Sequence, residues 1–164
     1  MIRRPPRSTL DRSSAASDVY KETDRMLAAQ KNIIIMLTSN VNRHSICLQP
    51  TLLTQILQNF VQNAIKFTLE DKSIAINSQR IDDSIVISVT DEGPGIDEKI
   101  DLFAPFKRVG GKAGAGLGLF LAKNAADTLG GTISLKNRTD GVIGTVATVT
   151  LFGKPKNKRT KNGT

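Results

Sequence analysis

The chain is 164 residues long, with 39% hydrophobic residues, 23% charged residues, one cysteine and one histidine. This composition suffices for a buried core and excludes an intrinsically disordered chain, while Cys47 and His44 alone can build neither a disulfide scaffold nor a zinc cluster. The longest uninterrupted apolar run, residues 33–37, is too short to cross a bilayer, and no segment has the apolar core of a secretory signal. We therefore expect a soluble, cytoplasmic domain that makes no membrane contact itself, on a parent protein whose anchoring the sequence leaves open.

The net charge of +8 is concentrated at the two ends of the chain. Residues 1–12 carry +3 and residues 154–164 carry +5, so residues 13–153 are electrically balanced. A nucleic-acid-binding domain needs its basic residues on the folded surface that meets the phosphates. The charge pattern therefore argues against nucleic acid as a partner.

The same ends set the expected domain boundaries. Residues 1–22 are rich in Arg, Ser and Pro and are expected to form a disordered arm, whose opening is similar to translated cloning sequence. Residues 23–153 are expected to form one folded domain, and residues 154–164 a basic disordered tail.

The apolar pattern predicts an alternation of helices and strands within the folded domain. In chain order, we expect a helix at 24–31, a strand at 32–37 with a hairpin partner at 45–48, a helix at 51–68, strands at 73–77 and 84–90, a short helix at 97–102, a helix at 117–129, and strands at 132–137 and 145–152. In the first helix, Met26, Leu27 and Ala28 should face inward, and Gly130 should cap the last helix. Because the helices fall between pairs of strands, the order indicates an α+β fold, a two-layer sandwich whose mixed sheet is covered on one face.

The predicted helix at 51–68 carries a polar face whose residue types are able to bind a metal ion and a phosphate. Gln55, Asn59, Asn63 and Lys66 fall within an arc of about 80°, since each residue of a helix turns by about 100°. Amide oxygens are neutral ligands for a magnesium ion that keeps several waters, and an ammonium group neutralises a phosphate. The alternative is an ordinary solvated face, although asparagine is a poor helix former that such a face has no reason to repeat.

Two glycine-containing segments lie further along the chain. After a predicted strand, Asp91 can accept a hydrogen bond from an exocyclic amine such as that of adenine, while Gly93 and Gly95 let a flat ring approach the backbone. The alternative for this segment is a plain tight turn. Residues 110–118 run into the last predicted helix, whose first N–H groups can bind an anion such as a phosphate, although the spacing matches neither a P-loop nor a dinucleotide fingerprint.

The order of these segments resembles the catalytic ATP-binding domain of sensor histidine kinases, a branch of the Bergerat-fold ATPases. Residues 59–68 are similar to the N box of that family, residues 91–96 to its G1 box, residues 103–106 to its F box and residues 114–119 to its G2 box. The resemblance covers the expected domain and implies the Bergerat ATP-binding fold, ATP and Mg²⁺ as cofactors, and a transferase function in two-component phosphorelay signalling.

The resemblance also implies roles for individual positions. Asn59, Asn63 and Lys66 would be the catalytic set, with Asn59 and Asn63 holding Mg²⁺ and all three meeting the phosphates, and Asp91 would recognise the adenine amine. The other cofactor-binding positions would be Phe67, Gly93, Gly95, Ile96, Phe106, Lys107, Arg108, Gly114, Gly116, Leu117, Gly118 and Leu119. The segment between the F and G2 boxes would be a mobile lid, whose basic residues are either phosphate partners or solvated loop residues: Lys107, Arg108 and Lys112.

One departure from the family pattern bears on activity. Kinases of this family carry an acceptor histidine followed by an acidic residue, but His44 is followed by Ser45 and is not expected to be the acceptor. The resemblance therefore implies transfer to a histidine on a separate dimerisation domain, with a response regulator further along the relay and little activity of this chain alone. Two alternatives stay open: a stand-alone serine kinase or ATPase, which would need an acidic base where the chain has Gln55 and Gln58, and a non-catalytic nucleotide-sensing module.

Overall fold

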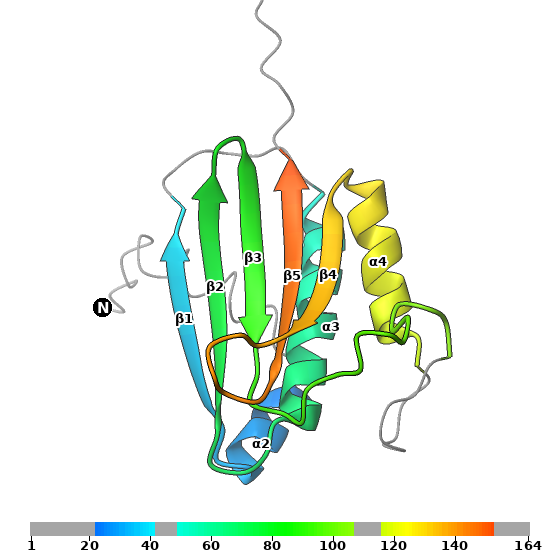
Figure 1. Ribbon diagram of the computed structural model, residues 1–164. Coiled ribbons are helices and arrows are strands. Elements are labelled where there is room, and N and C mark those ends of the chain that lie inside the picture. Colours follow the sequence, from blue (N-terminus) through cyan, green and yellow to red (C-terminus); the bar gives the residue numbers. More distant parts are fainter. Residues whose placement is uncertain (1–21, 42–48, 107–115, 153–164) are drawn as a thin grey trace, which may run out of the picture.

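The structure, a computed structural model, describes residues 22–41, 49–106 and 116–152. Its centre is a mixed five-stranded sheet with the strand order β1-β2-β3-β5-β4 (Figure 1). β1 lies parallel to β2, and the other neighbouring strands are antiparallel. The strands are β1 Ile34–Asn40, β2 Ser73–Ile81, β3 Ser84–Thr90, β4 Thr132–Asn137 and β5 Thr145–Phe152, and the helices are α2 Glu22–Gln30, α3 Pro50–Phe67 and α4 Gly118–Thr128.

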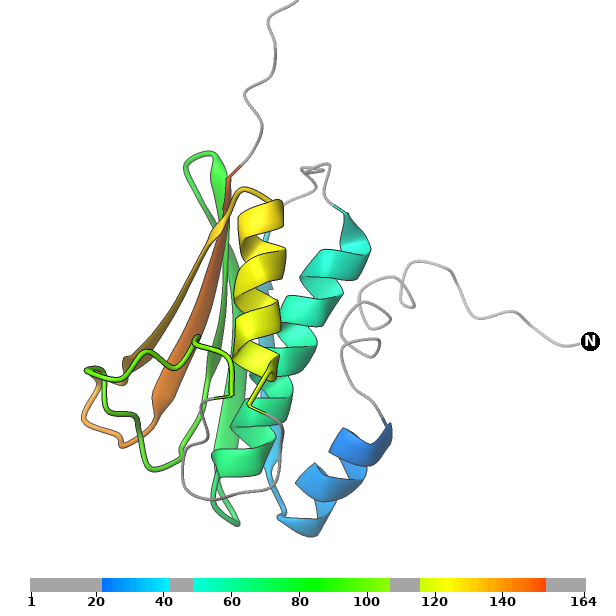
Figure 2. The same ribbon diagram turned by 90° about the vertical axis from the view of Figure 1, so that its right-hand side faces the viewer.

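The helices form a second layer on one face of this sheet (Figure 2). α3 and α4 pack against each other, and alternate residues of the central strands point into the layer between sheet and helices. The buried side chains of this core include Val89, Val149 and Leu151 from the strands and Ile56 and Phe60 from α3. The predicted α+β sandwich, with a mixed sheet covered on one face, is therefore confirmed.

α3 is capped at its C-terminal end by Lys31, the residue that follows α2. The Nζ atom of Lys31 donates to the main-chain oxygens of Ile65 at 2.8 Å, Lys66 at 3.0 Å and Thr68 at 3.1 Å. The last carbonyl groups of a helix lack helical partners and carry the negative end of its dipole, so an ammonium group is well placed there.

α4 begins beside α3 and ends in the predicted glycine cap. Gly130 has a φ angle of 70°, its N–H donates to the Asp127 oxygen, and the Gly131 N–H donates to the Ala126 oxygen at 2.9 Å. This pair of hydrogen bonds is a Schellman motif, in which glycine adopts the left-handed conformation without steric cost. The helix packs through its buried small residues, Ala122, Ala125 and Ala126.

The prediction for the first helix is wrong in its inward face. Only Ala28 is buried in α2, whereas Met26 is 59% exposed and Leu27 is 37% exposed. This nine-residue helix lies at the edge of the domain and contacts α3 along a narrow strip, so most of its surface faces solvent.

The short helix predicted at 97–102 is also wrong, because this segment forms turns. The carboxylate of Asp97 accepts a hydrogen bond from the Lys99 N–H at 3.0 Å, and that of Asp101 accepts one from the Phe103 N–H at 3.1 Å. Such bonds satisfy main-chain donors locally and compete with the helical pattern.

The remaining segments divide between confirmed and undescribed ones. The strands at 84–90, 132–137 and 145–152 are confirmed with their predicted bounds. The predicted hairpin strand at 45–48 and the tail at 154–164 lie outside the described residues, as does nearly all of the arm at 1–22. Among the described helices, none combines the length and apolarity needed to span a membrane.

Candidate functional site

The three segments singled out in the sequence meet at one end of the sheet. An added Cβ at Gly93 would lie 3.0 Å from the main-chain oxygen of Phe67, at the end of α3. A Cβ at Gly118, the first residue of α4, would lie 2.9 Å from Oδ1 of Asn59. These close approaches bring together the C-terminal half of α3, the loop after β3 and the start of α4, where glycine is the residue that fits.

The polar face of α3 looks toward the start of α4. Nδ2 of Asn59 donates to the main-chain oxygen of Gln55 at 3.0 Å, which orients the amide so that Oδ1 faces Gly118. Asn63 and Lys66 follow along the same helix and are half-buried. The structure thus places Asn59 beside the first residue of α4, while most of the glycines before that helix lie outside the described residues.

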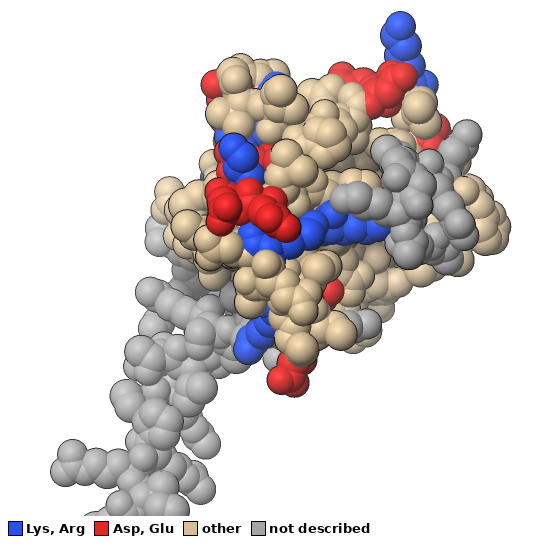
Figure 3. Space-filling model, turned by 90° about the horizontal axis from the view of Figure 1, so that it is seen from below, with Lys and Arg blue, Asp and Glu red and all other residues tan. Residues whose placement is uncertain are grey.

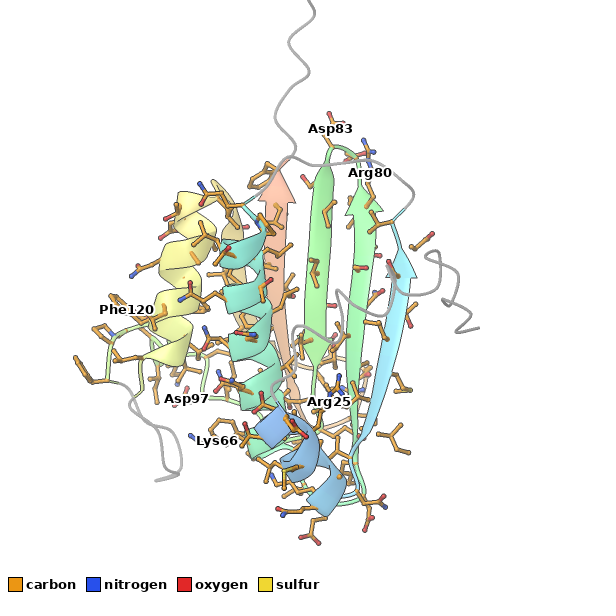
Figure 4. The ribbon with its side chains drawn as sticks, turned by 180° about the vertical axis from the view of Figure 1, so that it is seen from behind. Arg25, Lys66, Arg80, Asp83, Asp97 and Phe120 are labelled. Carbon is orange, nitrogen blue, oxygen red and sulfur yellow. The ribbon has the colours of Figure 1, made fainter. Side chains whose placement is uncertain are left out.

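Lys66 extends from the last turn of α3. Its Nζ lies 5.4 Å from the centre of the Phe67 ring, within the range of a cation–π contact. In Figure 4 the side chain projects from the helix toward the side of the molecule that carries α4 and Asp97. Seen from this end, Lys and Arg side chains form a band across the middle of the face, with Asp and Glu side chains against its left end (Figure 3).

Asp91 sits directly after β3 and is held by main-chain donors. Its Oδ1 atom accepts from the N–H groups of Gly93 and Thr145, each at 2.9 Å, and its own N–H donates to the Thr145 oxygen at 2.9 Å. The residue is only 9% exposed. Within the described residues Oδ2 accepts no hydrogen bond, so this oxygen is the one available to a ligand.

The protonation of Asp91 reflects two opposing influences. Burial raises the pKa of its carboxyl above the usual value, while the N–H groups of Gly93 and Thr145 and the charge of Arg138 lower the pKa in part. The neighbouring carboxyl of Glu92 behaves in the opposite way, because hydrogen bonds from the Ser73 N–H at 2.7 Å and hydroxyl at 2.9 Å lower its pKa. Glu92 thereby joins the loop after β3 to the start of β2.

Asn137 clamps the same loop from the end of β4. Its Oδ1 accepts from the Ile96 N–H at 2.7 Å, and its Nδ2 donates to the Ile96 oxygen at 2.8 Å. Gly95 has a φ angle of 79°, and a Cβ there would lie 2.8 Å from the Asn137 Oδ1. Glycine at this position is therefore required both by the backbone conformation and by the clamp.

A hollow of about 330 Å³ with both apolar and charged lining residues adjoins this clamp. It lies between the loop after β3 and the strand β4 and shares Ile96 with the clamp. Its lining residues are Ile96, Glu98, Lys99, Ile100, Asp101, Leu102, Phe103 and Leu135.

The glycine-rich side of the site is described only at its two ends. The Phe106 N–H donates to the Gly116 oxygen at 3.0 Å, and both residues have positive φ angles, 63° and 69°. Phe106 is 72% exposed, and Leu117 and Leu119 are half-buried. The other predicted positions of this part lie outside the described residues: Lys107, Arg108, Lys112 and Gly114.

Sequence reasoning missed the residues that support Asp91 from the far end of the chain. Thr145 binds its carboxylate, and Arg138 donates from Nη1 to its main-chain oxygen at 3.2 Å. A Cβ at Gly144 would lie 2.0 Å from that same oxygen, so only glycine fits there. A glycine directly before the last strand was the available signal, but it gives no indication of which residue it touches.

Comparison with known proteins defines the family. Residues 48–155 match the family model of histidine kinase-, DNA gyrase B-, and HSP90-like ATPases. The chain belongs to this family. Its relatives include the virulence sensor protein BvgS of Bordetella bronchiseptica, 35% identical over an alignment of 137 residues that covers 76% of this chain and 11% of that protein. The sensor protein CiaH of Streptococcus pneumoniae is 34% identical over an alignment of 126 residues that covers 72% of this chain and 28% of that protein.

Solved structures place the chain within one branch of the family. The catalytic domain of the histidine kinase ThkA, in a nucleotide-free form, is 27% identical with a TM-score of 0.72, over 88% of this chain and 94% of that one. Full-length ShkA in complex with AMPPNP is 26% identical with a TM-score of 0.72, over 85% of this chain and 29% of that one. The resemblance to the catalytic domain of sensor histidine kinases is thus confirmed, and the chain spans a tenth to about a quarter of its curated relatives named above.

Proposed function

We propose that the chain binds Mg-ATP and donates the γ-phosphate to a histidine of a separate dimerisation domain, in a two-component relay that continues to a response regulator. The observation that carries this proposal is the presentation of Asp91. Its carboxylate is buried, one oxygen is occupied by two main-chain N–H groups, and the other oxygen remains for a ligand.

The geometry at Asp91 favours adenine over guanine. A carboxylate oxygen accepts hydrogen bonds, and the six-position of adenine carries an amine that donates one, whereas guanine carries an acceptor there. Gly93 leaves no side chain between the carboxylate and the end of α3. The ring would therefore lie against the main chain, with Ile96 and Phe67 as apolar neighbours.

The phosphates would lie along α3 and the start of α4. Asn59 and Asn63 offer amide oxygens, which suit Mg²⁺ because this ion accepts oxygen ligands while keeping several waters. The orientation of the Asn59 Oδ1 toward Gly118 fits such a group. When bound, Mg²⁺ would neutralise charge on the phosphates; Lys66 would add a positive charge beside them, and Gly116 and Gly118 would let the main chain approach.

The transfer itself would require residues from a partner. In such reactions the protein contributes positioning and charge neutralisation, with little covalent chemistry of its own. The polar residues of α3 would hold the triphosphate, while the acceptor histidine and the residue that takes its proton would come from the dimerisation domain. We therefore propose that the isolated chain binds ATP with little hydrolysis or self-phosphorylation.

An incubation with γ-labelled ATP tests this proposal. The chain alone should remain unlabelled, and addition of a dimerisation domain from the same parent protein should give a histidine phosphate, which is acid-labile and base-stable. The label should disappear with the Asn63→Asp variant. Stable label on the isolated chain, at a serine or at His44, would overturn the proposal in favour of another kinase chemistry.

A further inference from the structure

Two basic residues outside the predicted ligand set bind main-chain oxygens behind the site. Lys31 follows α2, and Arg138 follows β4. Lys31 holds the last turn of α3, while Arg138 holds the end of β3 at Asp91. Neither side chain belongs to the polar face or the loops that would touch a nucleotide, so each acts on one half of the site from outside.

Lys31 is itself fixed on the loop that follows α3. Its main-chain oxygen accepts from the Asp71 N–H at 3.0 Å, and the next residue, Asn32, donates from Nδ2 to the Asp71 carboxylate at 2.7 Å. From this anchored backbone the ammonium group reaches three carbonyl oxygens at the end of α3. One of those oxygens belongs to Lys66, so the ammonium group of Lys31 holds the turn from which the Lys66 side chain projects.

Arg138 is fixed equally firmly beside Asp91. Its own N–H donates to the Gly144 oxygen at 3.0 Å, and its guanidinium group pairs with the Asp140 carboxylate through Nε at 3.0 Å and Nη2 at 2.5 Å. The remaining Nη1 donor binds the main-chain oxygen of Asp91. The Arg138 side chain is only 15% exposed, whereas its partner Asp140 is 57% exposed, so the ion pair lies at the surface and covers the contact with Asp91 from outside.

We propose that Lys31 and Arg138 are positioning residues for opposite halves of the nucleotide site, an inference that rests on the proposed function. Lys31 positions the last turn of α3, which carries Lys66 on the phosphate side, and Arg138 positions the carboxylate that recognises the base. The two contributions are separable, because Lys31 holds the end of α3 and Arg138 holds the end of β3.

Two variants and two matched controls test this separation. Lys31→Met keeps the length of the side chain and removes its donors, and Arg138→Gln removes the guanidinium fork. Lys123→Met changes an exposed lysine that pairs with Asp127 on α4. Arg80→Gln changes an arginine that binds the oxygen of Asp82 and pairs with Asp83 in the β2–β3 hairpin, at the opposite end of the sheet (Figure 4).

Dissociation constants for Mg-ATP, Mg-GTP and adenosine provide the decisive readout. Lys31→Met should weaken Mg-ATP binding about tenfold and adenosine binding by a smaller factor, because Lys66 on the turn it holds faces the phosphates while Phe67 on the same turn adjoins the base. Arg138→Gln should weaken adenosine and Mg-ATP by the same factor, again about tenfold, and reduce the preference for ATP over GTP. Lys31→Arg should restore most of the affinity, and both controls should bind like the parent chain.

A uniform loss would contradict the proposal. If both variants weakened all three ligands by the same factor, the residues would have only a general structural role, and if neither weakened any ligand they would have no role at the site. Should Lys31→Met fail to fold, Lys31→Gln retains one donating amide and gives the same test with a smaller effect.

Amide hydrogen exchange of the ligand-free chain separates this inference from the proposed function. Lys31→Met should speed exchange at the Thr68 N–H, which donates to the Ala64 oxygen, and Arg138→Gln should speed exchange at the N–H groups of Asp91 and Thr145. If the parent chain fails to bind Mg-ATP, the proposed function is rejected, and the exchange pattern still decides whether each residue holds its own half. Unchanged exchange in both variants would overturn the positioning role.

Discussion

The base half and the phosphate half of the proposed site are built in different ways. On the base half, main-chain N–H groups from two elements fix the Asp91 carboxylate, and glycines leave no space for other side chains. On the phosphate half, the ligand-facing groups are side chains of one helix face, and Asn63 makes no hydrogen bond to any described residue. We therefore expect the base half to be sensitive to crowding of the backbone, and the phosphate half to be sensitive to side-chain chemistry.

The largest effect should follow from crowding the base half with Gly144→Ala. The added Cβ would lie 2.0 Å from the main-chain oxygen of Asp91, a residue that two hydrogen bonds hold to Thr145 at the start of β5. We expect the free energy of unfolding in urea to fall by about 3 kcal/mol or more.

Gly141→Ala is the matched control for this prediction. Gly141 has a φ angle of 85° but nothing within 4 Å of an added Cβ, so the cost should be that of the left-handed conformation alone, about 1 kcal/mol. If both variants lost the same free energy of unfolding, the close contact between position 144 and the Asp91 oxygen would be contradicted.

The next effect concerns base selectivity and is tested by Asp91→Asn. The amide oxygen can still accept from Gly93 and Thr145, but its NH₂ group then replaces the free acceptor. We expect calorimetric affinity for ATP to fall by about 10- to 100-fold, as for the loss of a hydrogen bond to a charged group, and the preference over GTP to vanish. Equal affinity of the parent chain for ATP and GTP would rule out adenine recognition by Asp91.

A smaller effect should appear on the phosphate half with Asn63→Asp. A carboxylate near the phosphates adds like-charge repulsion, so Mg-ATP binding should weaken about tenfold while adenosine binding stays unchanged. Gln58→Glu, on the same helix but outside the proposed site, serves as the control. If both variants bind Mg-ATP like the parent chain, the polar face of α3 is an ordinary solvated surface.

The same contrast explains which parts of the molecule the sequence could predict. The polar face of α3 follows from helical geometry within 12 residues, so Asn59, Asn63 and Lys66 could be grouped before the structure was available. Asp91 could be recognised by its place after a strand and before glycines. Its support could not, because Thr145 lies 54 residues further along the chain and its contribution is a main-chain N–H, which carries no residue-specific signal.

The wrong predictions also have local physical causes. The apolar residues of α2 satisfied a helical pattern, but an edge helix has too little neighbouring surface to bury Met26 and Leu27. The segment at 97–102 has a composition typical of a helix, but the carboxylates of two aspartates accept hydrogen bonds from the main-chain N–H groups two residues further along the chain. In both cases the deciding interaction was absent from the pattern of hydrophobic residues.

The smallest expected effect is a pair of opposite pH dependences at neighbouring carboxyls. The pKa of Asp91 is raised in the folded state, so the folded state binds more protons than the unfolded state does. The contribution of this carboxyl to stability is therefore present below its unfolded pKa and is lost as pH rises through its folded pKa. The pKa of Glu92 is lowered, so its stabilising contribution is present at neutral pH and is lost as pH falls through its folded pKa.

Urea unfolding between pH 3 and pH 7 measures this difference. Asp91→Asn should gain stability relative to the parent chain as pH rises, whereas Glu92→Gln should lose it, by about 1 kcal/mol or less for a partly exposed hydrogen bond. Parallel pH profiles for the two variants would contradict the opposite environments of these carboxyls.

The bond between Asp91 and Thr145 also has a consequence for how the chain folds. It joins residues 54 positions apart, and closing a flexible loop of that length costs roughly 3 to 4 kcal/mol of chain entropy. Contacts of such separation form slowly, so the base-reading carboxylate should be among the last features to assemble. A nucleotide that binds only the folded chain, with this bond formed, then stabilises the fold by about 2.7 kcal/mol at a concentration of 100 times its dissociation constant.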